Sequence, residues 1–202
     1  MRCFRHLVIV LSMIGALVAA PTAFAATTLD EVRSGFTVEG KPIPPEIFDD
    51  LGDSDLSDSN PILVTVDVRA AIGSNRYADP ITKDGRWVKQ TKANDKTVNG
   101  YEETAYEFIG RTRNDLLVVV TSYSGGGTGA FNTLHILDAA LVPAFDDNGR
   151  IYQRLNLTVL RSVALGDRWD GTVTISGNMV HVLTKTTTVS GGAPSSVEAR
   201  RP

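Results

Sequence analysis

Hydrophobic and polar residues alternate along much of the chain after residue 60, with the period of two that is typical of a β-strand. Residues 62–69 place isoleucine and valine on one face and mostly polar residues on the other, and residues 101–109 alternate in a similar way. Residues 116–121 are instead apolar on both faces. Because successive strand side chains point to opposite faces, we expect two half-buried strands and one central strand that is covered on both sides.

The last third of the chain predicts an antiparallel meander. Residues 151–165 form one long strand-like run, and Asp170-Gly171 marks a turn after it. Residues 172–176 and 179–184 alternate again on either side of Gly177-Asn178, which fits a two-residue hairpin turn.

Two middle segments are less regular. Residues 73–100 carry the turn signals Asp79-Pro80 and Asp84-Gly85, and we interpret them as a long surface hairpin or loop with a short strand around Trp87. Residues 130–138 could begin a helix or form a strand. The strand is favoured because Phe131 and Thr133 open the segment and Pro143 follows soon after.

The flanking segments differ from this pattern. Residues 26–60 are predicted to form an arm rich in proline and aspartate, with one short helix that begins near Pro45 and stops at Gly52. Residues 185–202 contain few apolar anchors and are predicted to be a disordered tail. Between them, residues 61–184 predict a mainly β domain. Its expected architecture is a single antiparallel β-sandwich or open barrel with one short N-terminal helix and long loops.

Residues 1–25 resemble a secretory signal peptide. Arg2 and Arg5 precede an apolar run of 14 residues, 7–20, and small residues stand at the two positions before Ala26 that a signal peptidase reads. This run is shorter than the roughly 20 apolar residues of a membrane-spanning helix. We therefore expect cleavage near Ala25, a secreted or periplasmic location, and no transmembrane anchor in the mature chain.

Cleavage would change both the charge and the chemistry of the chain. Loss of Arg2 and Arg5 reduces the 20 Lys and Arg to 18 against 23 Asp and Glu, which gives a net charge of −5. An acidic chain has no general attraction for nucleic acid, so that partner class is not expected. The single cysteine, Cys3, would be lost, which excludes disulfides, a thiol nucleophile and thiolate metal sites.

The glycine tract at residues 125–129 is the first candidate for function. It lacks the Lys-Ser/Thr ending of a phosphate-binding loop, and Ser124 does not stand in a G-x-S-x-G motif. It could be a plain connection between strands. Alternatively, backbone at Gly126 could approach a ligand closely beside the ring of Tyr123.

Histidine and acidic residues offer little evidence of a metal site. His135 and His181 have no second histidine nearby, and His135 is expected to be a hydrogen-bonded core residue or, in an enzyme, an acid or base. The acidic run 49–58 departs from a calcium loop at its glycine and glutamate positions. It is interpreted as a solvated turn, as is the segment 146–149, and no metal or cofactor is predicted.

Three further candidates for function, Arg161, Trp169 and Asp170, lie within or beside the predicted strand 151–165. Arg161 stands in register with apolar residues, so it must extend its charged end to solvent, find a carboxylate, or lie beside a bulge that turns it outward. A structural ion pair is favoured over a ligand-binding role. Trp169 lies between charged residues and is followed by Asp170. Both Trp169 and Trp87 could be exposed platforms for a partner or lids over the edge of the core.

These observations support three functional hypotheses. The leading one is an exported, non-enzymatic β-domain that binds an envelope or extracellular partner, a protein or a glycan, through the loops around Trp87, the glycine tract and Trp169. A small hydrolase in which His135 acts with a serine or aspartate brought close by the fold is the alternative. A structural or calcium-stabilised envelope protein is the third.

Overall fold

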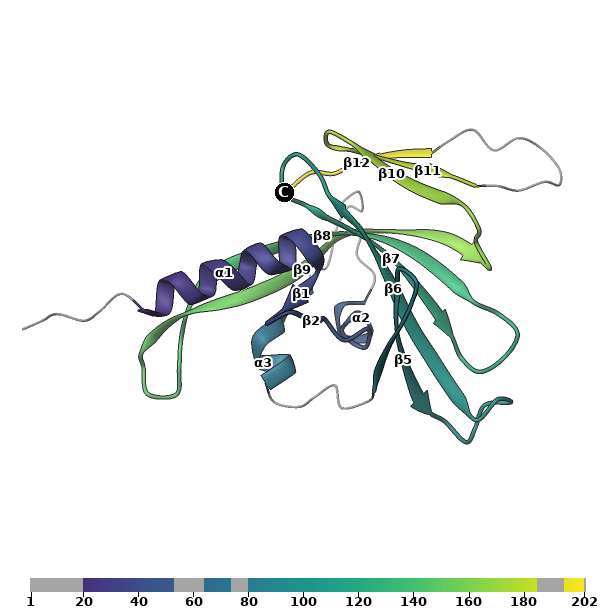
Figure 1. Cartoon of the computed structure of the whole chain (residues 1–202), viewed down its shortest axis with the longest axis horizontal. Coiled ribbons are helices and arrows are strands. Elements are labelled where there is room, and N and C mark those ends of the chain that lie inside the picture. Colours follow the sequence, from purple (N-terminus) through teal and green to yellow (C-terminus); the bar gives the residue numbers. More distant parts are fainter. Residues whose placement is uncertain (1–19, 53–63, 74–79, 185–194, 202) are drawn as a thin grey trace, which may run out of the picture.

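Seven strands form one antiparallel sheet that curls into a half-barrel (Figure 1). The computed structural model describes residues 20–52, 64–73, 80–184 and 195–201, with the backbone alone over 20–27. Strands β4 to β9 follow one another as a meander, and β3 joins the sheet at the far edge beside β9. The strands are β3 (Thr65–Asp67), β4 (Ile81–Asp84), β5 (Trp87–Ala93), β6 (Tyr101–Arg111), β7 (Leu117–Ser124), β8 (Phe131–Phe145) and β9 (Ile151–Asp167).

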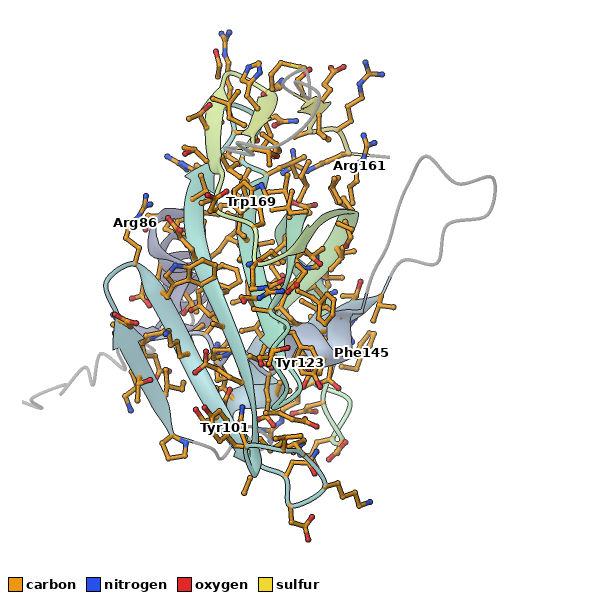
Figure 2. The ribbon with its side chains drawn as sticks, turned by 90° about the vertical axis from the view of Figure 1, so that its right-hand side faces the viewer. Arg86, Tyr101, Tyr123, Phe145, Arg161 and Trp169 are labelled. Atoms are coloured by element: carbon orange, nitrogen blue, oxygen red, sulfur yellow. The ribbon has the colours of Figure 1, made fainter. Side chains whose placement is uncertain are left out.

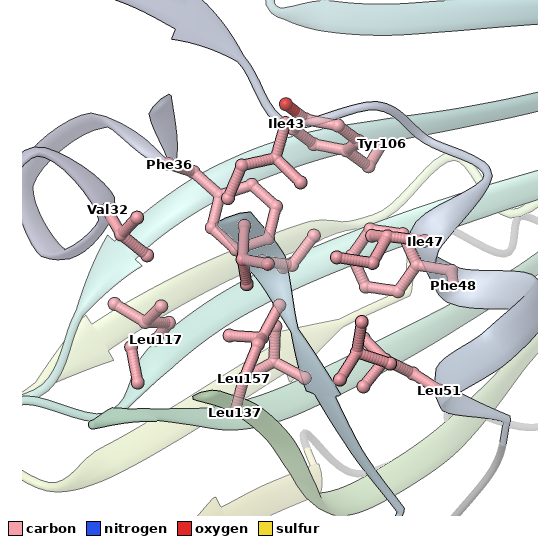
Figure 3. Close-up of a cluster of buried hydrophobic side chains, with 14 of the residues drawn as sticks. Val32, Phe36, Ile43, Ile47, Phe48, Leu51, Tyr106, Leu117, Leu137 and Leu157 are labelled. Carbon is pink, nitrogen blue, oxygen red and sulfur yellow. The ribbon is translucent and has the colours of Figure 1, made fainter. Parts of the chain in front are cut away.

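The N-terminal arm packs into the concave, inner face of this sheet (Figure 1). It consists of α1 (Ala20–Gly35), the short hairpin of β1 (Thr37–Val38) and β2 (Lys41–Pro42), and α2 (Ile47–Leu51), while α3 (Val68–Gly73) follows β3. The arm and the sheet together bury a first hydrophobic core, drawn in Figure 3. Its largest fully buried side chains are Phe36, Ile43, Ile47, Leu51, Tyr106, Leu117, Leu137, Leu155 and Leu157.

A small second sheet covers the outer face of the half-barrel (Figure 1). It contains β10 (Thr172–Ser176), β11 (Met179–Leu183) and β12 (Ser195–Glu198). Leu116, Val118 and Val120 of the central segment belong to this second core, whereas the residues between them, Leu117 and Val119, belong to the first. The doubly apolar run at 116–121 is therefore covered on both sides, as its composition predicts.

The mainly β antiparallel architecture is confirmed. The strands expected at 101–109, 151–165, 172–176 and 179–184 are present with small changes of boundary. The expected turn at Gly177-Asn178 is also present, because Ser176 pairs directly with Met179.

Several boundaries were predicted wrongly. The strand expected at 62–69 ends at Asp67, because the chain turns into α3 there and the Asp67 carboxylate accepts a hydrogen bond from the Ala70 N–H. Pro143 does not close β8, which continues to Phe145 opposite β9. Beyond Leu137 the described part of β8 has a strand on one side only, and an edge of this kind tolerates a missing N–H.

The helix content was underestimated. The short helix before Gly52 is present as α2, but α1 and α3 were not expected. Leu29 and Val32 lie three residues apart on one face of α1, and they pack on the first core together with Phe36, which directly follows the helix. Cleavage after Ala25 would fall within α1 and stays a prediction, because residues 1–19 lie outside the described part. No helix in the described part is long and apolar enough to cross a membrane.

The prediction of a disordered tail is wrong for residues 195–201. β12 pairs with β11, and Val197 and Ala199 are buried in the second core. Arg201 then donates two hydrogen bonds to the Asp138 carboxylate, at 3.0 and 3.2 Å, and one to the Asn114 carbonyl at 2.8 Å. The C-terminal strand thus fastens the second sheet to the first.

Replacing Val197 with aspartate should lower the free energy of unfolding by about 3 kcal/mol or more, because the change places a charge in the second core. Ser196, its exposed neighbour, provides the matched control, and Ser196→Asp should change this energy by less than about 0.5 kcal/mol. Urea denaturation followed by circular dichroism measures both. Equal effects of the two changes would show that β12 does not stabilise the fold.

Candidate functional site

The inner face of the half-barrel changes from apolar to polar toward the end where β5 and β7 finish and β6 and β8 begin. The strand registers place a set of mostly polar side chains on this face beyond the first core. They are Gln90, Lys92, Glu102, Thr104, Thr121, Tyr123, Phe131 and Thr133. A concave surface with convergent polar groups and rings is the usual form of a ligand site.

Helix α2 is tied to this polar end by side-chain hydrogen bonds. The Glu46 backbone N–H donates to Gln90 Oε1 at 3.1 Å, and Gln90 Nε2 donates to Glu46 Oε2 at 3.3 Å. Lys92 Nζ lies 3.7 Å from Glu46 Oε1. Desolvation raises the pKa of Asp49 on the same helix; Asp50 and Glu102 raise it further, while Lys92 opposes them.

Tyr123 and Phe131 form an exposed pair of rings beside these charges. They are directly opposed on β7 and β8, and 41% and 59% of their surfaces are exposed. The glycine tract lies under both rings: a Cβ built on Gly125 would stand 3.3 Å from the Tyr123 hydroxyl, and one on Gly129 would stand 3.2 Å from the Phe131 ring.

The electrostatic environment links Tyr123 to the charges of the polar end. Desolvation raises the pKa of the Tyr123 phenol, Glu102 and Asp49 raise it further, and Lys92 lowers it. We refer to Asp49, Lys92, Glu102, Tyr123 and Phe131 as the rim cluster. It presents two ring surfaces next to carboxylate and ammonium groups, which suits a ligand with both apolar and hydroxyl-bearing surfaces.

Gly126 is a structural residue of this end. Its φ is +77°, and a Cβ there would come within 2.4 Å of Thr97 Oγ1 and of the Tyr101 carbonyl. The Gly126 carbonyl accepts a hydrogen bond from the Asn99 N–H at 3.1 Å. The close backbone approach expected at this glycine is therefore made by the β5–β6 loop of the same chain.

His135 lies on the inner face of β8 and is only 4% exposed. Its Nε2 is 3.0 Å from Thr121 Oγ1, its Nδ1 is 2.9 Å from Ser162 Oγ, and its ring centre is 5.3 Å from that of Phe48. It is thus a hydrogen-bonded core histidine that also touches a serine. Ser162 was not singled out from the sequence, because its face depends on a bulge in β9.

That bulge also corrects the interpretation of Arg161. Arg161 pairs with Ile136 while Val159 pairs with Leu137, so Leu160 is an extra residue. After this extra residue, odd-numbered side chains point to the outer face and no longer to the inner face. Val163 and Leu165 therefore pack on the second core, whereas Leu155, Leu157 and Val159 belong to the first. The single apolar face predicted through Arg161 is wrong, and the half-buried Arg161 lies beside a bulge, one of the three arrangements considered.

Both tryptophans act as lids. Trp87 and Trp169 are half-buried and pack against the second core. The Trp169 N–H donates to Asn132 Oδ1 at 3.2 Å, its indole donates to Thr184 Oγ1 at 3.4 Å, and its neighbour Asp170 is exposed. Figure 2 shows Trp169 and Arg161 toward the small sheet, whereas Tyr123 and Tyr101 lie toward the other end. The predicted binding residues therefore do not form one surface.

The described residues provide no support for a metal site. In the described ranges no group of three or more His, Cys, Asp or Glu side chains could hold a metal ion. Asp146 Oδ1 accepts hydrogen bonds from the Asn148 and Arg150 N–H groups at 2.9 and 2.8 Å, so this carboxylate shapes its own turn. Most of the other acidic run, from Asp53 onward, lies outside the described residues.

Comparison of the chain with protein-family models, with curated proteins and with solved structures found no match. The functional argument therefore rests on the geometry of the chain itself.

Gly126→Ala should lower the free energy of unfolding by about 2 kcal/mol or more, because the new Cβ would strain the backbone and overlap Thr97 and Tyr101. Gly127→Ala provides the control, since a Cβ on Gly127 meets no atom within 4 Å and should cost less than about 1 kcal/mol. Thermal denaturation of the two variants makes the comparison. Similar melting temperatures would contradict the close loop contact.

Proposed function

We propose that this chain is an exported β-domain that binds a glycan of the envelope or extracellular space at the rim cluster. The observation that carries the proposal is the exposed pair of Tyr123 and Phe131, directly opposed beside Lys92 and Glu102. The C–H faces of a sugar stack on aromatic rings, and its hydroxyl groups hydrogen-bond to carboxylates and amides. A protein partner would use a larger apolar centre than this ring pair offers.

The surroundings of the rim cluster support a site that exists before the ligand arrives. Glu46 and Gln90 fix α2 to β5, and the glycine tract lies against both rings. Rings held in place lose little conformational entropy on binding, which favours affinity for a small polar ligand.

Titration of the ¹⁵N-labelled protein with a panel of soluble neutral, acidic and amino-sugar oligosaccharides tests the proposal. At least one class should shift the amide resonances of residues 123–131, and Tyr123→Ala and Phe131→Ala should each weaken its binding about tenfold or more. Phe145→Ala is the matched control, because Phe145 is a 71% exposed ring at the tip of the β8–β9 hairpin. Binding that is unaffected by the rim variants, or equally weakened by Phe145→Ala, would overturn the glycan site.

A hydrolase is the second candidate, and the contact between Ser162 and His135 favours it. Thr121 Oγ1 donates to the Thr133 carbonyl at 3.3 Å, so it can accept a hydrogen bond from His135 Nε2–H. In that tautomer Nδ1 is the acceptor for the Ser162 hydroxyl proton, which is how a general base activates a serine. Exposure of only 4% at His135 is the observation against this role.

A serine-directed fluorophosphonate probe distinguishes this second candidate. An enzyme should be labelled at Ser162, and labelling should disappear in Ser162→Ala and in His135→Gln. Ser122→Ala is the control, because Ser122 lies on the opposite face of β7 from Thr121 and should leave labelling unchanged. Absence of labelling in the native protein would leave His135 as a purely structural residue.

A further inference from the structure

A hollow lies on the inner face, away from the rim cluster along β5 and β6. It has a volume of about 280 Å³ and lies between the arm and the β4–β5 hairpin. We call it the β4–β5 hollow. Its lining residues are Gly35, Thr37, Pro42, Lys83, Gly85, Arg86, Trp87, Val88, Tyr106 and Phe108.

The floor of the β4–β5 hollow is apolar and firmly packed. Val88 and Tyr106 are paired across β5 and β6 and are 9% and 2% exposed. Phe108 stacks on Phe36 of the arm, with ring centres 5.8 Å apart, and Phe36 makes an edge contact with Tyr106 at 5.1 Å. An apolar body of a ligand would therefore meet a surface that does not need to rearrange.

Every charged residue that lines the hollow is a cation. Lys83 pairs directly with Val88, so its side chain extends from the same face of the hairpin as the apolar floor. The Lys83 side chain makes no hydrogen bond or ion pair with any described residue. The Arg86 side chain at the turn is 84% exposed and bridges to Glu107 at 2.9 Å. In a chain with a net charge of −3, this local excess of positive charge selects for an anion.

We propose that the β4–β5 hollow binds a small organic anion with an apolar body, of the aromatic or medium-chain carboxylate class. The ring or chain would lie on Val88 and Phe108, and the carboxylate would pair with the Lys83 ammonium. The volume of about 280 Å³ is at the small end of ligand pockets, which corresponds to a ligand of roughly ten to fifteen heavy atoms. This site is separate from the rim cluster and does not depend on the proposed glycan.

The test uses 4-phenylbutyrate as the probe and 4-phenylbutan-1-ol as its uncharged analogue. Binding is followed through the amide shifts of the ¹⁵N-labelled protein, because the Trp87 side chain packs against the second core on the other face of the sheet. We expect a saturable change with the carboxylate and about tenfold weaker binding of the alcohol. Lys83→Met should weaken binding of the carboxylate about tenfold and leave that of the alcohol unchanged. Lys96→Met, an exposed lysine in the β5–β6 loop, should change neither.

The pattern of these shifts locates the site. In the unaltered protein the shifts should centre on residues 35–42 and 83–88. Equal affinity for acid and alcohol, no effect of Lys83→Met, or shifts centred elsewhere would overturn the proposal. The shifts of the unaltered protein with acid and alcohol are recorded on the native fold, so the test stays decisive if Lys83→Met is unstable.

Discussion

The burial of one strand on both faces is the constraint on which the rest of this structure depends. From Leu116 to Val120 every side chain is almost fully buried, and neighbours along the chain belong to opposite cores. Burying each valine or leucine contributes about 1.5–3 kcal/mol, so leaving either face in water would cost a large part of the stability of a domain. A covering layer is therefore needed on each side: the N-terminal arm supplies the inner one, and the small sheet of β10, β11 and β12 supplies the outer one.

The N-terminal arm does not cover the whole inner face of the sheet. The rim cluster and the β4–β5 hollow both lie where its cover ends. Helix α2 stops at Leu51, and the sheet continues beyond the first core with polar residues and the rings of Tyr123 and Phe131. Toward the β4–β5 hairpin the arm borders the sheet at Gly35, Thr37 and Pro42 and leaves a hollow. Ligand sites on β-scaffolds commonly lie where rigid strands meet loops, because the strands hold the contacting side chains in place.

The two sites differ in chemistry because they differ in charge. Carboxylates of α2 and β6 surround the single ammonium of Lys92 at the rim cluster, whereas only cations line the β4–β5 hollow. Two rings and mixed charges suit a neutral, hydroxyl-rich ligand, and an apolar floor under a lysine suits a carboxylate. His135 lies deeper than both and joins β7, β8 and β9 through Thr121 and Ser162.

Local periodicity was enough to predict the mainly β fold, the doubly apolar strand, most strand positions and the hairpin turn at Gly177, because each of these depends on residues close together in the chain. The sequence also excluded thiol chemistry in any chain that lacks Cys3. The sequence indicates Tyr123 as a candidate binding residue. It does not indicate that Phe131, Lys92 and Glu102 lie beside Tyr123 in one site. The tertiary structure alone decided which face Ser162 takes, that both tryptophans are lids, and that residues 195–198 complete a sheet. The physical reason is register: pairing between distant strands, and one extra residue at Leu160, determine which side chains meet, and a single residue of shift reverses every face beyond it.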